Sequence, residues 1–371
     1  MKRPTYCVIM AGGKGTRFWP LSRSHRPKQL LKILSPKTLI RETADRVLPL
    51  TGRRQTIVVT VAEQLKGLSK ELPMLSGINL LAEPEGRNTA PCIGLAALEI
   101  VMRNPEAIMI VLPADHWVAD KEAFRRTLRD AVELAADSEN LVTIGIRPDY
   151  PETGYGYIMR GKRLNRSLGS KAFQVKEFKE KPSAKSAQRL IRRGSLWNSG
   201  IFIWHAAALL DLLRRYQPGI FEGLKRISRA AGRHRLATAG PKLHAVIARE
   251  YKKMPNISID HAVLERAGSE GKVLTLEADF GWSDVGSWAA VHRMMRKDEN
   301  GNAGNGKWLG LGAKNCLIHA PDRLVVLLGI EDVAVIDSPD ALLVGDLKRS
   351  QDVRELVDEL NKEGYGAYTV K

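Results

Sequence analysis

Residues 6–17 read YCVIMAGGKGTR. The apolar run at the start of this stretch is typical of a buried strand, and the glycines that follow let the backbone turn tightly. Such a turn can present backbone N–H groups and the forked guanidinium of Arg17 to phosphate oxygens. The alternative is a plain strand-to-helix turn, since the stretch is neither a Walker loop nor a dinucleotide fingerprint. The stretch predicts an α/β fold with a ligand-binding turn after its first strand.

Short apolar runs alternate with helical patterns through the first two thirds of the chain. Further strand-like runs occupy residues 56–60, 107–112 and 141–144, and the clearest helical patterns occupy residues 91–103 and 121–136. Buried strands separated by helices predict a Rossmann-like, mostly parallel sheet flanked by helices. Ligands of such sheets bind beyond the carboxyl ends of the strands, so we expect the site residues to follow the strands.

The pattern changes after about residue 301. Short strand-like runs now follow Gly- and Asn-rich turns, at residues 324–328, 333–336 and 341–344. An amphipathic helix is expected over residues 350–361. We therefore predict a catalytic domain over residues 1–297 and a small β-rich C-terminal domain over residues 306–371 that ends in a helix.

The composition limits the classes of function. Lys and Arg outnumber Asp and Glu by 58 to 41, giving a net charge of +17. The basic residues are scattered and lack the interleaved aromatic residues of single-strand binders, so we predict attraction of small phosphorylated substrates and no nucleic-acid partner. The three cysteines show no Cys-x-x-Cys spacing, and no apolar run approaches the ~18 residues of a membrane span. We expect a soluble, cytoplasmic protein with no membrane partner; a homodimer is one candidate state.

The glycine-rich turn belongs to a longer motif. It continues into FWPLS at residues 18–22 and PKQ at residues 27–29. The combination resembles the signature of the sugar-nucleotide pyrophosphorylases, in particular the mannose-1-phosphate guanylyltransferases. Further stretches carry the same resemblance, at residues 83–91, 112–116, 154–158, 180–182, 197–200 and 281–286. The resemblance implies a fold of the nucleotide-diphospho-sugar transferase type.

The resemblance also implies a reaction: GTP and α-D-mannose 1-phosphate give GDP-mannose and pyrophosphate. The attacking sugar phosphate is already an anion, so no Ser, Cys or His nucleophile is needed, and cations with a metal ion neutralise the charge of the in-line transfer. The alternative is another sugar 1-phosphate, such as glucose 1-phosphate, or another nucleoside triphosphate. Some bacterial relatives carry a C-terminal isomerase domain; because this sequence ends soon after the amphipathic helix, we expect no phosphomannose isomerase activity.

Asp115 and Asp284 are the predicted ligands of Mg²⁺. Asp115 ends a strand-like run, and Mg²⁺ usually takes one or two carboxylates together with phosphate oxygens and water. Asp284 is the partner that the resemblance implies. Taken alone, each Asp would rather be a helix cap or a turn residue, but together, in their motifs, they favour a metal site. By resemblance, Arg17 would hold the leaving pyrophosphate, Lys28 the α-phosphate and Lys181 the phosphate of the sugar. A non-catalytic relative would be expected to lack one of these five residues.

Two further sets of residues are predicted to bind the nucleotide and the sugar. The nucleotide-binding set is Gly12, Gly13, Gly15, Thr16, Arg17, Glu83, Arg87, Asn88 and Thr89. A carboxylate such as Glu83 can accept hydrogen bonds from guanine N1–H and N2–H₂, which adenine cannot donate; the alternative is an exposed loop acid. Arg87, Asn88 and Thr89 would open a helix whose N-terminus favours phosphate.

The sugar-phosphate-binding set is Gly156, Glu180, Lys181, Asn198 and Asp260. The polar side chains suit hydrogen bonds to sugar hydroxyls, and Gly156 permits close approach of the backbone. Asn198 would otherwise cap a turn, and Asp260 would otherwise cap a helix over residues 262–266.

Overall fold

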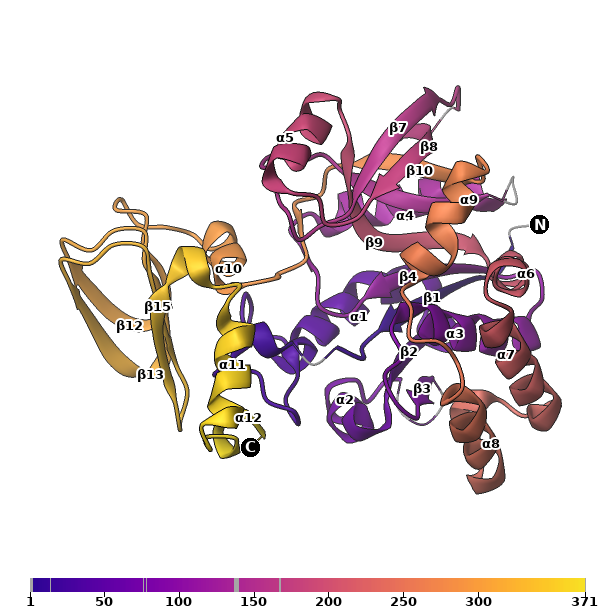
Figure 1. Cartoon of the computed structure of the whole chain (residues 1–371), viewed down its shortest axis with the longest axis horizontal. Helices are drawn as coiled ribbons and strands as arrows, with labels where there is room; N and C mark the ends of the chain where they lie inside the picture. The colour runs from indigo at the N-terminus through magenta and orange to yellow at the C-terminus, as the bar shows by residue number, and fades with distance from the viewer. Residues whose placement is uncertain are drawn as a thin grey trace. The chain divides into compact units, whose positions relative to one another are not determined.

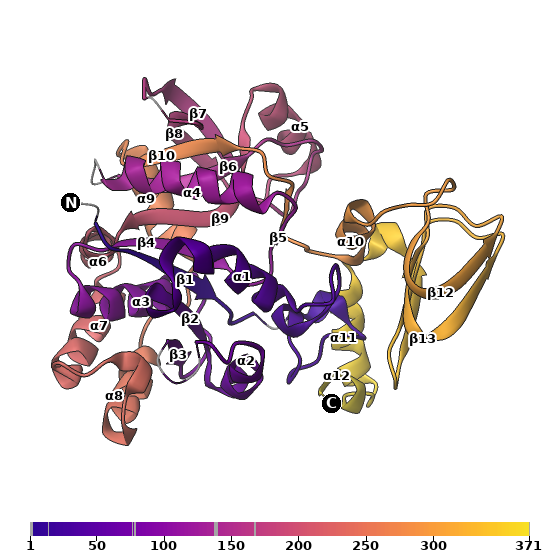
Figure 2. The same cartoon turned by 180° about the vertical axis from the view of Figure 1, so that it is seen from behind.

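The computed structural model describes residues 3–13, 15–75, 77, 79–136, 140–166 and 168–370. The chain forms two compact units (Figures 1 and 2). The first unit comprises Met1–Gly12, Thr43–Ala114 and Val118–Trp282, and the second comprises Gly13–Glu42, Asp115–Trp117 and Ser283–Lys371. Each unit has an apolar core of its own.

A nine-stranded sheet forms the centre of the first unit. Its strands are β1 (Thr5–Met10), β2 (Thr56–Val61), β3 (Leu80–Glu83), β4 (Ile108–Pro113), β6 (Leu141–Ile146), β7 (Tyr157–Arg163), β8 (Lys171–Lys179), β9 (Leu196–His205) and β10 (Val273–Ala278). They lie in the order β3-β2-β1-β4-β9-β6-β10-β8-β7. All four predicted strand runs are strands of this sheet, which confirms the α/β fold.

The sheet is mixed in direction. Strands β3, β2, β1 and β4 are parallel to one another, and β6 is parallel to β10. Strand β9 runs antiparallel between β4 and β6, and β8 and β7 continue the sheet in antiparallel pairs. The parallel part carries the apolar runs that are buried on both faces, as expected for strands covered by helices.

Helices cover this sheet. They are α1 (Leu39–Thr51), α2 (Leu65–Glu71), α3 (Thr89–Arg103), α4 (Lys121–Ala136), α5 (Ala184–Arg192), α6 (Ala206–Tyr216), α7 (Pro218–Ala231), α8 (Pro241–Tyr251) and α9 (Glu265–Ser269). Helix α3 packs against α6 and α7, and α4 lies along β6, β9 and β10 (Figure 2). The two predicted helices correspond to α3 and α4. Among the described residues no helix is both long and apolar enough to cross a membrane.

The second unit holds a separate four-stranded sheet. Its strands, in sheet order, are β12 (Ala303–Leu311), β13 (Leu317–Leu328), β14 (Val333–Asp337) and β15 (Leu342–Asp346). The first three are parallel, and β15 is antiparallel to β14. Helices α10 (Trp288–Met294), α11 (Val353–Lys362) and α12 (Ala367–Val370) accompany this sheet. The β-rich C-terminal part with its final helix is therefore confirmed, whereas the domain boundary between residues 297 and 306 stays a prediction.

The second unit also contains the glycine-rich turn and the segment after it. Short strands β5 (Trp117–Val118) and β11 (Trp282–Ser283) mark two of the points at which the chain passes from one unit to the other. The core of the second unit joins Phe18 and Trp19 to Trp288, and the rings of Phe18 and Trp288 meet edge to face with centroids 4.9 Å apart. Because aromatic side chains contribute a large share of core energetics, this cluster fixes the turn against the C-terminal part of the chain.

Candidate active site

A pocket of about 260 Å³ lies within the second unit, at the glycine-rich turn. Its lining residues come from the turn and the segment after it, from the stretches that follow β4 and β11 in the sequence, and from α11. They are Gly15, Thr16, Arg17, Phe18, Lys28, Asp115, His116, Asp284, Gly286 and Arg354. The structure thus brings together Arg17, Lys28, Asp115 and Asp284, four of the five residues predicted to act in catalysis.

Lys28 connects the two predicted metal ligands. Its side chain is buried, and Nζ donates to Oδ2 of Asp115 at 2.8 Å and to the backbone oxygen of Asp284 at 2.6 Å. Nζ also lies 5.6 Å from the centroid of the Phe18 ring, within the range of a cation–π contact. The buried ammonium of Lys28 thus binds the carboxylate of Asp115 and the backbone carbonyl of Asp284, and this holds both residues at the wall of the same pocket.

Asp115 is held in its ionised form. Burial raises the pKa of its carboxyl, but the ammonium of Lys28 and the charge of His116 outweigh burial, so the pKa lies below its ordinary value. A carboxylate that stays ionised at neutral pH has the hard oxygens that Mg²⁺ prefers.

The donor set fits a divalent metal ion. In the part of the chain that the structure describes, no group of three or more His, Cys, Asp or Glu side chains could hold a metal by itself. Mg²⁺ is commonly bound by one or two carboxylates, with substrate phosphates and water completing its shell. Asp115 and Asp284, which line one pocket, match that arrangement, since a triphosphate would supply the remaining oxygens.

Gly15 is required by the close approach of Lys28. Its φ is 66°, in the left-handed region that favours glycine. A Cβ atom at this position would lie 2.3 Å from Cβ of Lys28 and 2.9 Å from its backbone nitrogen. No other residue type fits there without moving Lys28. Lys14, the neighbour of Gly15 in the turn, lies outside the described residues.

Glu83 is buried at the end of β3, in the first unit. It is only 3% exposed, and the hydroxyl of Tyr251 donates to its Oε1. A Cβ atom on Gly12 would lie 3.4 Å from Glu83 Oε2, so this carboxyl lies close to Gly12, the last residue of the first unit before the chain enters the second. Burial raises the pKa of Glu83, and the bond from Tyr251 only partly offsets this. The alternative of an exposed loop acid is therefore wrong, while the predicted contact with guanine stays a prediction.

The segment after Glu83 opens α3, as the sequence indicates. Asn88 has a φ of 62° and caps the helix, its Oδ1 accepting from the backbone N–H of Thr89 at 2.9 Å. The guanidinium of Arg87 donates to Glu85 and to the backbone oxygen of Met254, both at 2.7 Å. These bonds hold the start of α3 in place. A role of Arg87, Asn88 and Thr89 in nucleotide binding stays a prediction.

The predicted sugar-binding residues cluster in the first unit. Asn198 Nδ2 donates to Asp260 Oδ1 at 2.8 Å. A Cβ atom on Gly156 would lie 2.5 Å from Glu180 Oε2 and 3.5 Å from Cβ of Asn198. Lys181 is exposed, with Nζ 3.5 Å from Glu180 Oε1. All five predicted residues thus lie in one neighbourhood, and the glycine is needed for the approach of Glu180.

Asp260 does not take the helix-cap role that was the alternative to sugar binding. It begins a π-helical turn (Asp260–Leu264), but its side chain binds Asn198, and Ile259 stands at the N-terminal cap. Burial and the nearby charge of Glu180 raise the pKa of Asp260 to about 6. The helix-cap alternative is therefore wrong, and the negative charge of Glu180 acts on a buried Asp260 carboxyl that binds Asn198.

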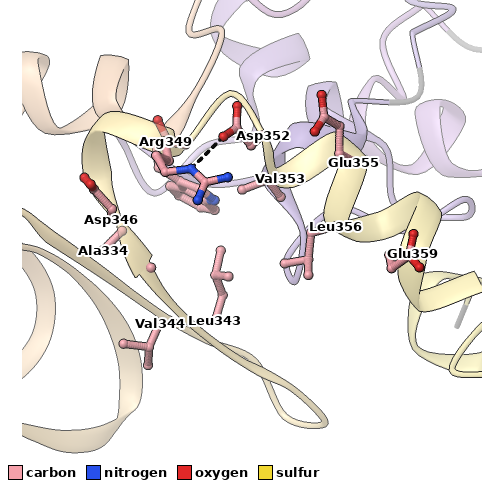
Figure 3. Close-up of a pocket in the computed structure, with 13 residues that line it drawn as sticks. Ala334, Leu343, Val344, Asp346, Arg349, Asp352, Val353, Glu355, Leu356 and Glu359 are labelled. Carbon is pink, nitrogen blue, oxygen red and sulfur yellow. Dashed lines mark hydrogen bonds and ion pairs between the residues drawn. The ribbon is translucent and has the colours of Figure 1, made fainter. Parts of the chain in front are cut away.

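A second pocket of the second unit, of about 450 Å³, does not suit a triphosphate. Figure 3 shows its apolar side chains, Leu343, Val344 and Leu356, beneath a rim of acidic residues on and before α11. The rim consists of Asp346, Asp352, Glu355 and Glu359. The basic residue of this lining, Arg349, is paired with Asp352 at 2.8 Å. Carboxylates of this density would repel phosphate oxygens.

Two residues near the sites were not predicted from the sequence. Tyr251 binds Glu83 from a position 168 residues further along the chain, and Arg354 lines the phosphate-sized pocket from α11. Neither belongs to a motif, and the amphipathic pattern of α11 gives no sign that one of its polar residues faces a site.

Two protein families match the sequence. Residues 6–301 match the family described as nucleotidyl transferase, and residues 306–360 match the family described as MannoseP isomerase/GMP-like beta-helix domain. The chain belongs to the nucleotidyl transferase family. Members of this family generally use a divalent metal ion, in agreement with the donor set of Asp115 and Asp284.

Known relatives extend the likeness to nearly the whole chain. The mannose-1-phosphate guanylyltransferase of Escherichia coli (strain K12) is 36% identical over 97% of this chain and 74% of its own length. That of Klebsiella pneumoniae is 38% identical over 97% of this chain and 75% of its own. A crystal structure of mannose-1-phosphate geranyltransferase from Thermus thermophilus has a TM-score of 0.84 and 35% identity, covering 96% of this chain and 99% of that one.

The role of Gly15 can be tested by replacing it with alanine. We expect Gly15→Ala to lower kcat/KM at least about tenfold, because the new methyl group displaces Lys28 from Asp115. Gly329→Ala is the matched control: Gly329 has a similar φ of 63°, and among the described residues only its chain neighbours come within 4 Å of the place that a methyl group would take. Steady-state kinetics and thermal unfolding of both variants separate displacement of Lys28 from backbone strain. Equal activity of the two variants would contradict the assignment.

The titration of Asp260 predicts a pH effect on stability. Because its pKa rises from 3.8 to about 6 on folding, the native state binds the proton more tightly. The free energy of unfolding should therefore fall as pH rises from about 4 to about 6 and stay lower above that, by at most about 3 kcal/mol. Urea unfolding at pH values on both sides of this window should show the fall in the wild type and its loss in Asp260→Asn. The exposed Asp149→Asn serves as control, and an identical pH dependence of Asp260→Asn and wild type would refute the shift.

Proposed function

We propose that this protein transfers a guanylyl group from GTP to α-D-mannose 1-phosphate, giving GDP-mannose and pyrophosphate. The observation that carries the proposal is the pocket in which Lys28 links Asp115 to Asp284, because a cation and two carboxylates beside a glycine-rich turn suit a metal-bound triphosphate. Relatives named mannose-1-phosphate guanylyltransferase, 36–38% identical over most of the chain, support the choice of both substrates.

The reaction is an in-line substitution at the α-phosphorus. An oxygen of the sugar phosphate forms the new P–O bond, and the bond from the α-phosphorus to the bridging oxygen of the β-phosphate breaks. The electron pair leaves with pyrophosphate, so no protein nucleophile is required. Catalysis then depends on positioning and on neutralising charge. Arg17 would bind the leaving pyrophosphate, Lys28 the α-phosphate and Lys181 the phosphate of the sugar.

We further propose Mg²⁺ as the metal ion. Asp115 and Asp284 would hold it, and when bound it supplies positive charge to the phosphate oxygens. Lys28 keeps Asp115 ionised and binds the backbone oxygen of Asp284, so both residues are held at the same pocket.

Recognition of the base and the sugar is assigned to residues of the first unit. Glu83, held by Tyr251, would accept hydrogen bonds from guanine, and Glu180, Asn198 and Asp260 would bind sugar hydroxyls. We place the protein in the cytoplasm, where its three free cysteines would stay reduced. The homodimer stays a prediction.

Substrate choice is tested by a matrix of GTP, ATP and dTTP against mannose 1-phosphate and glucose 1-phosphate, with pyrophosphate release as the readout. We expect the highest kcat/KM for GTP with mannose 1-phosphate. Glu83→Gln should narrow the preference for GTP over ATP, because an amide cannot accept from both N1–H and N2–H₂ in the same way. Equal efficiency with all three triphosphates would defeat the assignment of guanine.

The shared metal site is tested through both carboxylates. We expect Asp115→Asn and Asp284→Asn each to fold and to lose roughly 10²-fold or more in turnover, because each removes a partner of the transition-state charge. Since both act through one ion, the double variant should be scarcely worse than either single variant. Kinetics across a Mg²⁺ titration provide the measurement, with the exposed Asp358→Asn as control. Fully multiplicative losses would show that the two residues act independently.

A further inference from the structure

We propose that Arg354, on helix α11, binds the terminal phosphates of GTP and the pyrophosphate that they become. The inference rests on the proposed function and adds a substrate-binding residue from the C-terminal part of the chain. Arg354 lines the same pocket as Arg17, Lys28, Asp115 and Asp284, although it lies 337 positions beyond Arg17 in the sequence.

The packing of α11 fixes the position of Arg354. Val353 and Val357, on either side of Arg354 in the helix, are each 7% exposed and belong to the same apolar cluster as Phe18. Phe18 ends the 3-10 turn Thr16–Phe18 that carries Arg17, and α11 packs against this turn. Two buried valines one helical turn apart therefore hold the backbone of Arg354 beside the residues that line the pocket.

The guanidinium of Arg354 differs in its pairing from the basic residues near it in the sequence. Those neighbours are each paired, Lys348 with Asp332 at 2.7 Å, Arg349 with Asp352 at 2.8 Å and Lys362 with Glu359 at 3.0 Å. Within the described ranges, neither the Arg354 nor the Arg17 side chain forms a hydrogen bond or an ion pair. The pocket thus has two guanidinium groups whose donors are available to a ligand.

The charges of the pocket favour an anion with several phosphate oxygens. Lys28 is committed to Asp115 and to the backbone of Asp284, so it offsets only part of the charge of the two carboxylates. Pyrophosphate carries several negative charges, and the fork of a guanidinium matches two phosphate oxygens at once. Arg17 and Arg354 together supply two such forks, enough for several oxygens of both phosphoryl groups of pyrophosphate.

The test is calorimetric titration of the full-length protein with inorganic pyrophosphate in the presence of MgCl₂. Arg354→Gln and Arg354→Met both keep a long side chain with good helix propensity. We expect each to raise the Kd for pyrophosphate about tenfold or more, the loss typical of a charge-assisted pair. The Kd of Arg354→Lys for pyrophosphate should lie between the Kd of these two variants and that of the wild type, because lysine keeps the positive charge but lacks the forked guanidinium. The control is Arg296→Gln, an exposed arginine of the same unit outside the pocket, which should bind pyrophosphate as the wild type does.

Kinetics distinguish this role from a structural one. In Arg354→Gln the KM for GTP should rise while the KM for mannose 1-phosphate stays unchanged. A pyrophosphate Kd within about twofold of the wild type in both variants, or loss of folding in both, would overturn the inference. If the wild type makes no GDP-mannose, the proposed function fails, but the calorimetry still decides whether Arg354 binds pyrophosphate.

Discussion

The ion pair between Lys28 and Asp115, with the second bond from Lys28 to the backbone of Asp284, is the interaction on which the candidate site depends. A buried ammonium such as that of Lys28 is costly unless it is paired, and the half-buried Asp115 provides that partner. Gly15 must lack a side chain for Lys28 to reach Asp115 and the backbone of Asp284. One lysine in this way connects the segment after the turn to Asp115 and Asp284, all within the second unit.

The apolar cluster of the second unit supports the glycine-rich turn from the side of the core. Phe18 and Trp19 contribute to the same core as Trp288, Val353 and Val357, so the residues next to the phosphate-binding turn are buried by the last part of the chain. Hydrogen bonds extend this connection, since Trp19 Nε1 donates to the backbone oxygen of Tyr368 at 2.9 Å. The turn is thus supported by residues more than 250 positions away, and its geometry depends on their packing.

Local sequence patterns predicted many strands and helices and several of the residues that lie together in the candidate sites. Strands β1, β2, β4 and β6 are dominated by apolar, mostly β-branched residues that are buried, which is why they could be predicted. Strand β9 was missed because Asn198, Ser199 and Gly200 interrupt its apolar pattern, and its antiparallel position between β4 and β6 follows from pairing with strands far away in sequence. Likewise β12, rich in glycine, resembles a turn region, since three of its nine residues lack a side chain. The burial of Glu83 and the position of Arg354 depend on Tyr251 and Phe18, and no local signal connects these pairs.

The interleaving of the two units has a consequence for dissecting the protein. Because the second unit takes residues 13–42, 115–117 and 283–371, no single cut in the chain separates it from the first. A truncation at residue 297, the predicted end of the catalytic domain, would remove Leu317, Val353 and Val357 from the core that they share with Phe18 and Trp19. Phe18 and Trp19 would keep Trp288 but lose part of their apolar packing, and the newly exposed apolar surface would favour aggregation of the fragment. Folding of the glycine-rich turn thus depends on packing against the C-terminal part of the chain. Residues 1–297 are not expected to fold stably when expressed alone.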